Sequence, residues 1–305
     1  MSPFNEPVTS QTARQGTALA LVSMLSVQLG AAIAVHLIGD LGPAGVAWLR
    51  LAWATVLMLL IVRPRAATFT RRTLLIAVGL GVATAGFTLL FMSAIARIPL
   101  GTASALEFLG PLAVAVTKGR GRGRLLLPAL AAAGVVLLTA PWAGAVNLTG
   151  VLFALGSAGC LVVYILLTQR LSDELDGLAG LAVSIPVAGL IATVVAGPQV
   201  VAHLTPRVAL IGLGLAVLLP VLPLIFELQA LRRISASSFG TLLSLEPAIA
   251  MVLGVAILHQ VPAWTSLAGL VLVVAAGIGA ARAATRPATP SEPVPVLCQA
   301  TAVVE

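Results

Sequence analysis

The segment FGTLLSLEPAIA (Phe239–Ala250) contains a glutamate, Glu246, and a proline, Pro247, inside a long apolar run. A charged side chain at the centre of a lipid-spanning helix costs roughly 2.5–3.5 kcal/mol on insertion scales. Proline removes a backbone hydrogen bond and collides with the preceding turn. Such residues are tolerated where they face other protein or a water-filled cavity. The segment therefore predicts a broken spanning helix that faces the interior of a membrane protein.

A second segment, LEFLGPLAVAV (Leu106–Val116), repeats this arrangement with Glu107 and Pro111. Both interrupted helices carry an acid that is costly to expose to lipid. If the two helices face one another, both acids are kept away from lipid. We expect the two segments to line one central pathway, with their prolines as hinges.

The composition is that of a membrane protein. Hydrophobic residues make up 59% of the 305 residues and charged residues only 9%, with a mean hydropathy of +1.10, whereas a soluble domain has about 25% charged residues. Ten spanning helices of about 20 residues each would account for nearly the whole chain. This predicts an all-α membrane protein without a soluble catalytic domain. The expected spans are residues 17–39, 43–62, 73–96, 100–117, 125–140, 148–168, 178–196, 208–230, 237–258 and 263–281.

The positive charges indicate an orientation rather than nucleic-acid binding. The formal net charge is +7, but the cations lie in short loops beside apolar spans, where they determine topology. With the N-terminus cytoplasmic, fourteen Lys and Arg residues fall inside, Arg97 and Arg207 fall outside, and Arg50 lies within the second span. Both termini are therefore predicted to be cytoplasmic: a tail of residues 1–16, and a disordered tail of residues 282–305 that is rich in Pro, Ala and Thr.

An internal repeat agrees with this span count. RIPLGTASALEFLGP (Arg97–Pro111) and RISASSFGTLLSLEP (Arg233–Pro247) align without gaps, with Arg, Ile and Pro in matching places. Five spans separate the copies, so the second copy has the opposite orientation in the membrane. We therefore expect two inverted five-helix repeats, residues 17–141 and 148–281. Secondary transporters use this plan and bind substrate near the midplane, at the repeat interface.

The sequence has no Walker motif, no HExxH, no GxSxG and no Cys/His cluster. We expect no enzymatic activity, no cofactor and no metal site. Cys160 lies in an apolar run and Cys298 in the C-terminal tail, so a disulfide between them is not expected. Transport driven by an ion gradient requires instead a group that changes charge, a polar cavity and helices that can move.

Glu107, Glu227 and Glu246 are the carboxylates inside the expected spans. Desolvation disfavours the charged form of a carboxylate, so such a group can exchange a proton or bind the ammonium of a substrate. The alternative is a structural glutamate, protonated or paired, that holds helices together. Glu227 lies near the expected cytoplasmic end of its span, where the two interpretations are balanced.

Arg50, Gln28 and Tyr164 complete the candidate substrate- and proton-binding set. Arg50 could hold a carboxylate group or neutralise one of the glutamates, although a snorkelling or structural ion-pair role is favoured. Gln28 and Tyr164 are hydrogen-bonding groups in apolar runs, which makes them candidates for the lining of a cavity.

Six segments resemble a known family. They are SVQLGAAIA (Ser26–Ala34), GVAWLRLAW (Gly45–Trp53), IPLGTASALEFLGPLAVAV (Ile98–Val116), YILLTQR (Tyr164–Arg170), LPLIFELQAL (Leu222–Leu231) and FGTLLSLEPAIA (Phe239–Ala250). Together they resemble the EamA-type transporters of the drug/metabolite transporter superfamily, and more narrowly the bacterial threonine/homoserine exporters. Three positions depart from the family pattern: Thr88, Leu161 and His259 stand where asparagine, tryptophan and glutamate are expected.

The resemblance implies a multi-pass exporter of small amino acids in the bacterial cytoplasmic (inner) membrane, working by proton antiport and alternating access. It also implies that Glu107, Glu227, Glu246, Gln28 and Tyr164 match residues of those exporters. The expected partners are the amino-acid substrate, protons and the lipid bilayer, with the protein a monomer or weak dimer. The alternatives are an exporter of the same fold for aromatic amino acids, nucleosides or cationic drugs, and a non-transporting channel or scaffold.

Overall fold

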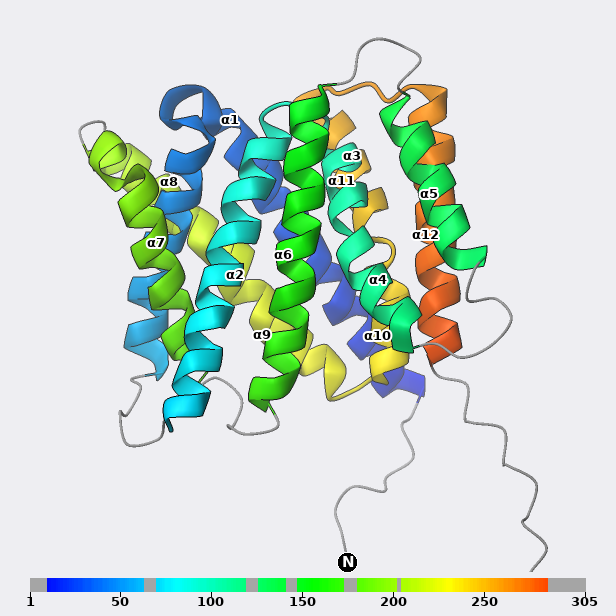
Figure 1. Cartoon of the computed structure of the whole chain (residues 1–305), viewed down its shortest axis with the longest axis horizontal. Coiled ribbons are helices and arrows are strands. Elements are labelled where there is room, and N and C mark those ends of the chain that lie inside the picture. Colours follow the sequence, from blue (N-terminus) through cyan, green and yellow to red (C-terminus); the bar gives the residue numbers. More distant parts are fainter. Residues whose placement is uncertain are drawn as a thin grey trace, which may run out of the picture.

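The computed structural model describes residues 10–62, 70–118, 126–140, 147–172, 180–201 and 204–284. Within these ranges the chain is all-helical, and the helices run between two ends of one bundle (Figure 1). The elements are α1 (Ser10–Val62), α2 (Arg71–Ile95), α3 (Leu100–Glu107), α4 (Leu109–Lys118), α5 (Leu126–Thr139), α6 (Leu148–Ser172), α7 (Leu181–Val201), α8 (Pro206–Ala216), the π-helical segment η4 (Val217–Val221), α9 (Leu222–Leu231), α10 (Ala236–Leu243), α11 (Glu246–Leu258) and α12 (Trp264–Ala284).

Seven helical stretches of the described chain are long and apolar enough to cross a membrane. Two further apolar stretches, 126–139 and 206–219, are shorter. The expectation of an all-α protein with membrane-spanning helices is confirmed. Helix α1 begins at Ser10 and α12 continues to Ala284, so both helices extend into the expected tails, and the remaining tail residues lie outside the described ranges.

Helix α1 contains two legs joined at one glycine. Gly42 has φ 69° and ψ 164°, which is not helical, and Pro43 follows it. Glycine adopts positive φ without the steric penalty that a Cβ imposes, and proline is well suited to open a new helix. The chain therefore reverses at this point within a single residue, and the second leg runs back toward the end of the bundle where α1 begins, diverging from the first leg (Figure 1).

The two segments that determine the fold are both interrupted helices. Helix α3 ends at Glu107, and Pro111, about one turn later, can donate no hydrogen bond to the carbonyl of Glu107. In the same way Pro247 can donate none to the carbonyl of Leu243, the last residue of α10, and α11 begins at Glu246. Each break thus places a glutamate at a helix end inside the bundle.

The π-helical segment η4 has a similar cause. Pro220 has no amide proton, and at the end of η4 the N–H of Leu222 donates to Val217 O instead of Leu218 O. The carbonyl of Leu218 accepts a hydrogen bond of 2.7 Å from the hydroxyl of Ser26 on α1. A side chain of α1 therefore satisfies a backbone group that the neighbouring helix cannot satisfy itself.

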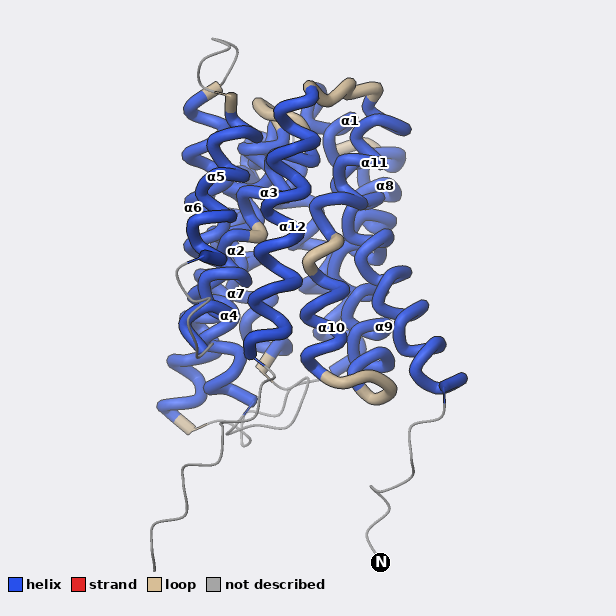
Figure 2. Tube along the Cα trace, turned by 90° about the vertical axis from the view of Figure 1, so that its right-hand side faces the viewer, coloured by secondary structure: helices blue, strands red, loops and turns tan. Residues whose placement is uncertain are grey.

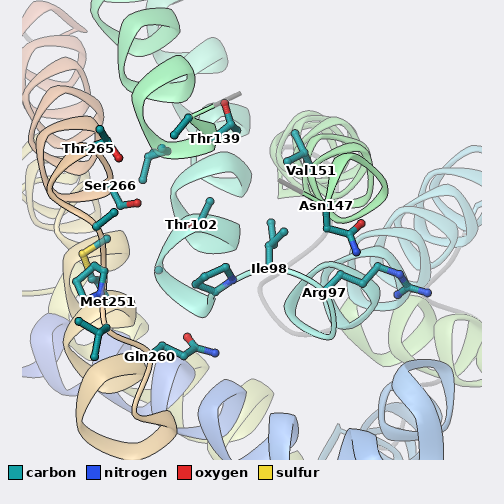
Figure 3. A pocket seen from close by; sticks show the side chains of 17 residues that line it. Arg97, Ile98, Thr102, Thr139, Asn147, Val151, Met251, Gln260, Thr265 and Ser266 are labelled. Carbon is teal, nitrogen blue, oxygen red and sulfur yellow. The ribbon is translucent and has the colours of Figure 1, made fainter. Parts of the chain in front are cut away.

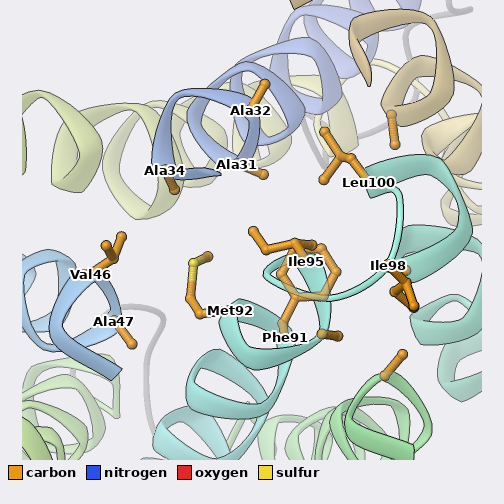
Figure 4. Close-up of a cluster of buried hydrophobic side chains, with 14 of the residues drawn as sticks. Ala31, Ala32, Ala34, Val46, Ala47, Phe91, Met92, Ile95, Ile98 and Leu100 are labelled. Carbon is orange, nitrogen blue, oxygen red and sulfur yellow. The ribbon is translucent and has the colours of Figure 1, made fainter. Parts of the chain in front are cut away.

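Small side chains let the helices approach closely. In the largest core cluster, alanines of α1 such as Ala31 and Ala34 face Met92 and Ile95 of α2 (Figure 4). In a membrane, helices associate largely through such close packing, because lipid is as apolar as the helix surface. The alanine-rich composition is therefore used at helix contacts.

Two crossings bring backbones together. A Cβ on Gly134 of α5 would lie 2.8 Å from the carbonyl oxygen of Gly269 on α12, and a Cβ on Gly269 would lie 2.6 Å from the oxygen of Gly134. At the second crossing, a Cβ on Gly101 of α3 would lie 2.7 Å from the Cβ of Met251 on α11. Neither crossing leaves room for a side chain at its glycine.

We expect Gly269→Ala to lower the midpoint of thermal unfolding of the detergent-purified protein, because the new methyl group would overlap a rigid carbonyl; overpacking of this kind costs about 1–3 kcal/mol. Gly159→Ala on α6 is the matched control. A new Cβ there would meet no described atom within 4 Å apart from its chain neighbours and the backbone of its own helix, so the midpoint should stay unchanged or rise through helix propensity. Equal midpoints for the two variants would contradict the crossing.

Candidate functional site

Hydrogen bonds link Glu246, on α11, to side chains of α1 and α3. The side-chain nitrogen Nε2 of Gln28, on α1, donates to Glu246 Oε1 at 3.0 Å and to the hydroxyl of Ser104, on α3, at 3.4 Å. Gln28 is 2% exposed and Ser104 4%. With its amide nitrogen used in this way, Gln28 has its carbonyl oxygen Oε1 buried without a donor among the described residues.

Glu107 is held from α6. The hydroxyl of Ser157 lies within hydrogen-bond distance of Glu107 Oε1 and, at 3.0 Å, of the carbonyl oxygen of Phe87 on α2. A hydroxyl has one proton to donate, so Ser157 can serve only one of these two acceptors at a time. Ser157 therefore holds the Glu107 carboxylate only while its proton is not donated to the carbonyl oxygen of Phe87.

Glu227, on α9, is held in the same manner from α1. The hydroxyl of Ser23 lies 3.2 Å from Glu227 Oε1 and 3.4 Å from the carbonyl oxygen of Pro223. The structure thus contains two serine–carboxylate brackets, each consisting of a fully buried serine, a glutamate and a main-chain carbonyl from a third position. The charge of Glu246 interacts with the glutamates of both brackets, Glu107 and Glu227.

Arg50, on the second leg of α1, is close enough to Glu107 for their charges to interact. No ion pair joins it to any carboxylate among the described residues, and its Nε is buried without a hydrogen-bond partner. A structural ion pair, one of the two roles favoured from the sequence, is therefore not formed among the described residues. A guanidinium inside the bundle is left with donors that no described protein group accepts.

Tyr164 lies beside the Glu227 bracket. Its ring meets Phe87 edge-to-face, with centroids 5.6 Å apart and planes at 72°, and its hydroxyl interacts with Thr168 and with the charge of Glu227. The six residues singled out from the sequence thus form one polar row through the bundle. The three glutamates, Arg50 and Tyr164 are only half-buried.

Three polar residues that bond to this row were not singled out as site residues from the sequence: Ser23, Ser104 and Ser157. Thr88 on α2 is also fully buried, and its hydroxyl has no hydrogen-bond partner among the described residues. Ser23 and Ser157 lie on the first helix of each expected repeat. Extending the repeat alignment to those helices, with a short gap, would have paired the two serines.

The two interrupted helix pairs are held together mainly at one end. Helix α3 packs on α11 at the crossing of Gly101 and Met251, whereas α4 packs on α6 and α12 and α10 packs on α12 and α1. In Figure 2, α4 and α10 lie on either side of α12. Glu107 and Glu246 thus lie just past the contact of Gly101 with Met251, where the pair α3–α4 separates from the pair α10–α11.

A cavity of about 300 Å³ lies on the other side of this crossing, at the end of the bundle away from Ser10. Its lining combines Arg97 and several neutral polar side chains with apolar ones (Figure 3). None of the six candidate residues lines it. One lining residue has a structural role, because Gln260 Oε1 accepts a hydrogen bond of 2.9 Å from the backbone N–H of Leu100, the first residue of α3.

Comparison with known proteins gives a consistent result. Residues 148–281 match the EamA-like transporter family. The threonine/homoserine exporters RhtA of Escherichia coli K12 and of Salmonella typhimurium LT2 are each 36% identical to the chain over 262 residues, which covers 85% of the chain and 88% of the exporter. A protein of known crystal structure, 16% identical, has the same fold, with a TM-score of 0.56 over 89% of this chain and 96% of its own.

We expect Gln260→Ala to destabilise the junction of α3 and α11, because Pro99 at the N-cap of α3 offers no side-chain acceptor and Gln260 replaces it. Loss of a capping acceptor costs about 0.5–2 kcal/mol. Gln260→Glu keeps an oxygen at this position and adds a negative charge at a helix N-terminus, which is favourable. The midpoint of thermal unfolding should fall for the alanine variant only. A similar fall for both would show that Gln260 acts through packing.

Proposed function

The chain belongs to the EamA-type transporters of the drug/metabolite transporter superfamily, and on this basis we propose that it exports small amino acids of the threonine and homoserine class by proton antiport. The membrane is the bacterial inner membrane. The observation that carries the proposal is the polar row itself. It places Glu107, Glu227 and Glu246 next to one another inside a bundle of apolar helices.

In the proposed mechanism, substrate from the cytoplasm enters between the halves of the protein and its ammonium group binds at Glu246 or Glu107. The halves then rock and substrate leaves on the other side. A proton from outside neutralises a glutamate, and this permits the return. Because ammonium and proton compete for one carboxylate, each excludes the other, and the two fluxes are coupled.

The mechanism requires two halves, and we assign them to residues 17–141 and 148–281, with ten spanning segments. These are the two legs of α1, then α2, α3–α4, α5, α6, α7, α8–α9, α10–α11 and α12. In support, α3 and α10 begin and end at positions that the sequence repeat aligns with one another. The guanidinium of Arg97 donates to Ser93 O at 2.7 Å, and that of Arg233 donates to Gln229 O at 2.7 Å.

Packing between the halves also supports the assignment. A Cβ on Gly150, in α6, would lie 2.8 Å from a methyl carbon of Ile98, and a Cβ on Gly16, in α1, would lie 2.7 Å from that of Ile234. Ile98 and Ile234 are aligned positions of the sequence repeat. Each half thus packs the start of its first helix on the same feature of the other half, as expected of a pseudo-two-fold arrangement.

The orientation follows from charge. We propose that the end of the bundle where α1 begins and α12 ends (Figure 1) is cytoplasmic, because most of the described basic residues lie at the helix ends found there. Arg97 and Arg207 lie at the other end. The described basic residues at the Ser10 end are Arg14, Arg71, Arg72, Lys118, Arg170, Arg232, Arg233 and Arg282.

Counterflow in proteoliposomes loaded with unlabelled threonine tests the function. Wild type should exchange labelled threonine and respond to a pH gradient. Glu246→Gln and Glu107→Gln each remove one titratable group; the variant that still exchanges but no longer responds to the gradient identifies the coupling site. Asp40→Asn, at an exposed helix end, should behave as wild type. Absence of threonine and homoserine exchange would contradict the amino-acid proposal, and the vesicles would then go to a panel of aromatic amino acids, nucleosides and cationic drugs.

Labelling of single cysteines tests the orientation. With Cys160 and Cys298 replaced by serine, Arg170→Cys should react with an impermeant thiol reagent only after the cells are opened, because α6 ends on the proposed cytoplasmic side. Val261→Cys, whose position is 90% exposed at the opposite end, should react in intact cells. The reverse pattern would contradict the orientation.

A further inference from the structure

We propose that Arg50 binds the carboxylate of the substrate while Glu246 and Gln28 bind its ammonium, so that the site selects zwitterionic α-amino acids over simple cations. The inference rests on the proposed function, since it assigns the two ends of an amino acid to two ends of the same polar row. It resolves the two roles that the sequence left open for Arg50.

The positive end of the row lacks an anion. Arg50 forms no ion pair with a described carboxylate, and its Nε donor is buried without an acceptor. The nearest candidate, Glu107, interacts with Arg50 only at longer range and uses Oε1 to accept from Ser157. A cation removed from water is costly unless it is paired and hydrogen-bonded. The arginine is therefore incomplete without a ligand.

A carboxylate suits the donors of Arg50 better than other ligand groups do. The guanidinium presents its N–H groups as a planar fork that matches the two oxygens of a carboxylate, and such bidentate pairs are among the stronger hydrogen bonds in proteins. Arg50 as a whole is half-buried although its Nε is sealed, and in our proposal a small ligand reaches the fork from the accessible part of the side chain. Snorkelling does not account for Arg50, because the charge lies inside the bundle beside Glu107.

The negative end of the row lacks donors. Gln28 gives its amide protons to Glu246 and Ser104, and this fixes its carbonyl oxygen as an acceptor that faces no described donor. An ammonium group has three protons to donate. Glu246 and the Gln28 oxygen together offer it a charged and a neutral acceptor on adjacent side chains. The Gln28–Glu246 hydrogen bond holds both in place before the ligand arrives.

The charge of Glu107 interacts with both Arg50 and Glu246, so the two proposed ligand-binding groups belong to one connected set of charges. A ligand with both charges can engage both ends of the row. A simple amine can satisfy only the acidic end and leaves Arg50 without an acceptor. The orphaned atoms thus distinguish zwitterions from amines without any contact to the substrate side chain.

Ligand-induced stabilisation of the detergent-purified full chain tests this with three matched probes: L-threonine, L-threoninamide, which lacks the carboxylate, and 2,3-dihydroxybutanoate, which lacks the ammonium. Wild type should bind threonine roughly ten- to a hundredfold more tightly than threoninamide, the range expected for hydrogen bonds to a charged group. Arg50→Gln should bring this ratio close to one. Arg207→Gln, at an exposed position on α8, is the matched control and should keep the wild-type ratio.

The outcomes separate this inference from the proposed function. A wild type that binds threonine and threoninamide equally well overturns the inference without any variant, and so does an Arg50→Gln protein that keeps the wild-type ratio, because Arg50 would then only neutralise Glu107. If Arg50→Gln does not fold, Arg50→Lys, which keeps the charge but not the fork, should reduce the ratio. If neither threonine nor homoserine binds, the proposed substrate class fails. The inference is then tested with alanine, leucine and phenylalanine, each compared with its own amide. Tighter binding of the amino acid than of its amide supports the inference, and equal binding overturns it.

Discussion

A proline inside a membrane helix leaves one carbonyl without an amide proton, and hydrocarbon offers that carbonyl no substitute. Much of the polar interior is arranged around this constraint. Pro111 and Pro247 interrupt the two central helix pairs, and the glutamates lie at the resulting helix ends. Pro220 coincides with the π-helical segment whose loosened carbonyl recruits Ser26. At Leu218 a backbone carbonyl that its own helix does not satisfy thereby bonds to a neighbouring helix.

The sequence reveals those features that conflict with lipid and conceals those that do not. An acid or a proline in an apolar run demands an explanation, so Glu107 and Glu246 were identifiable without a structure. A serine in the same run does not, because its hydroxyl usually bonds to its own helix, as that of Ser93 does to Leu89 O. Ser23 and Ser157 look alike in the sequence but reach across to other helices. Only packing decides between the two arrangements.

The two serine–carboxylate brackets use main-chain acceptors at corresponding positions but glutamates from different positions. Ser157 and Ser23 take corresponding carbonyls as second acceptors, Phe87 O and Pro223 O, which are separated by the same offset as the sequence repeat. The glutamates they hold come from unrelated places, α3 in one bracket and α9 in the other. The two brackets therefore share their main-chain acceptor position but differ in the element that supplies the glutamate.

Because α3 and α11 touch at Gly101, a small change in the angle between them would move Glu107. Glu107 lies six residues further along α3, about 9 Å from this fulcrum at 1.5 Å per residue. A tilt of about 10° between the helices would move the carboxylate by about 1.6 Å over that lever arm. Such a displacement is comparable to the difference between making and losing a hydrogen bond. A glycine that binds nothing therefore sets the scale on which the charges of the row can be brought together or separated.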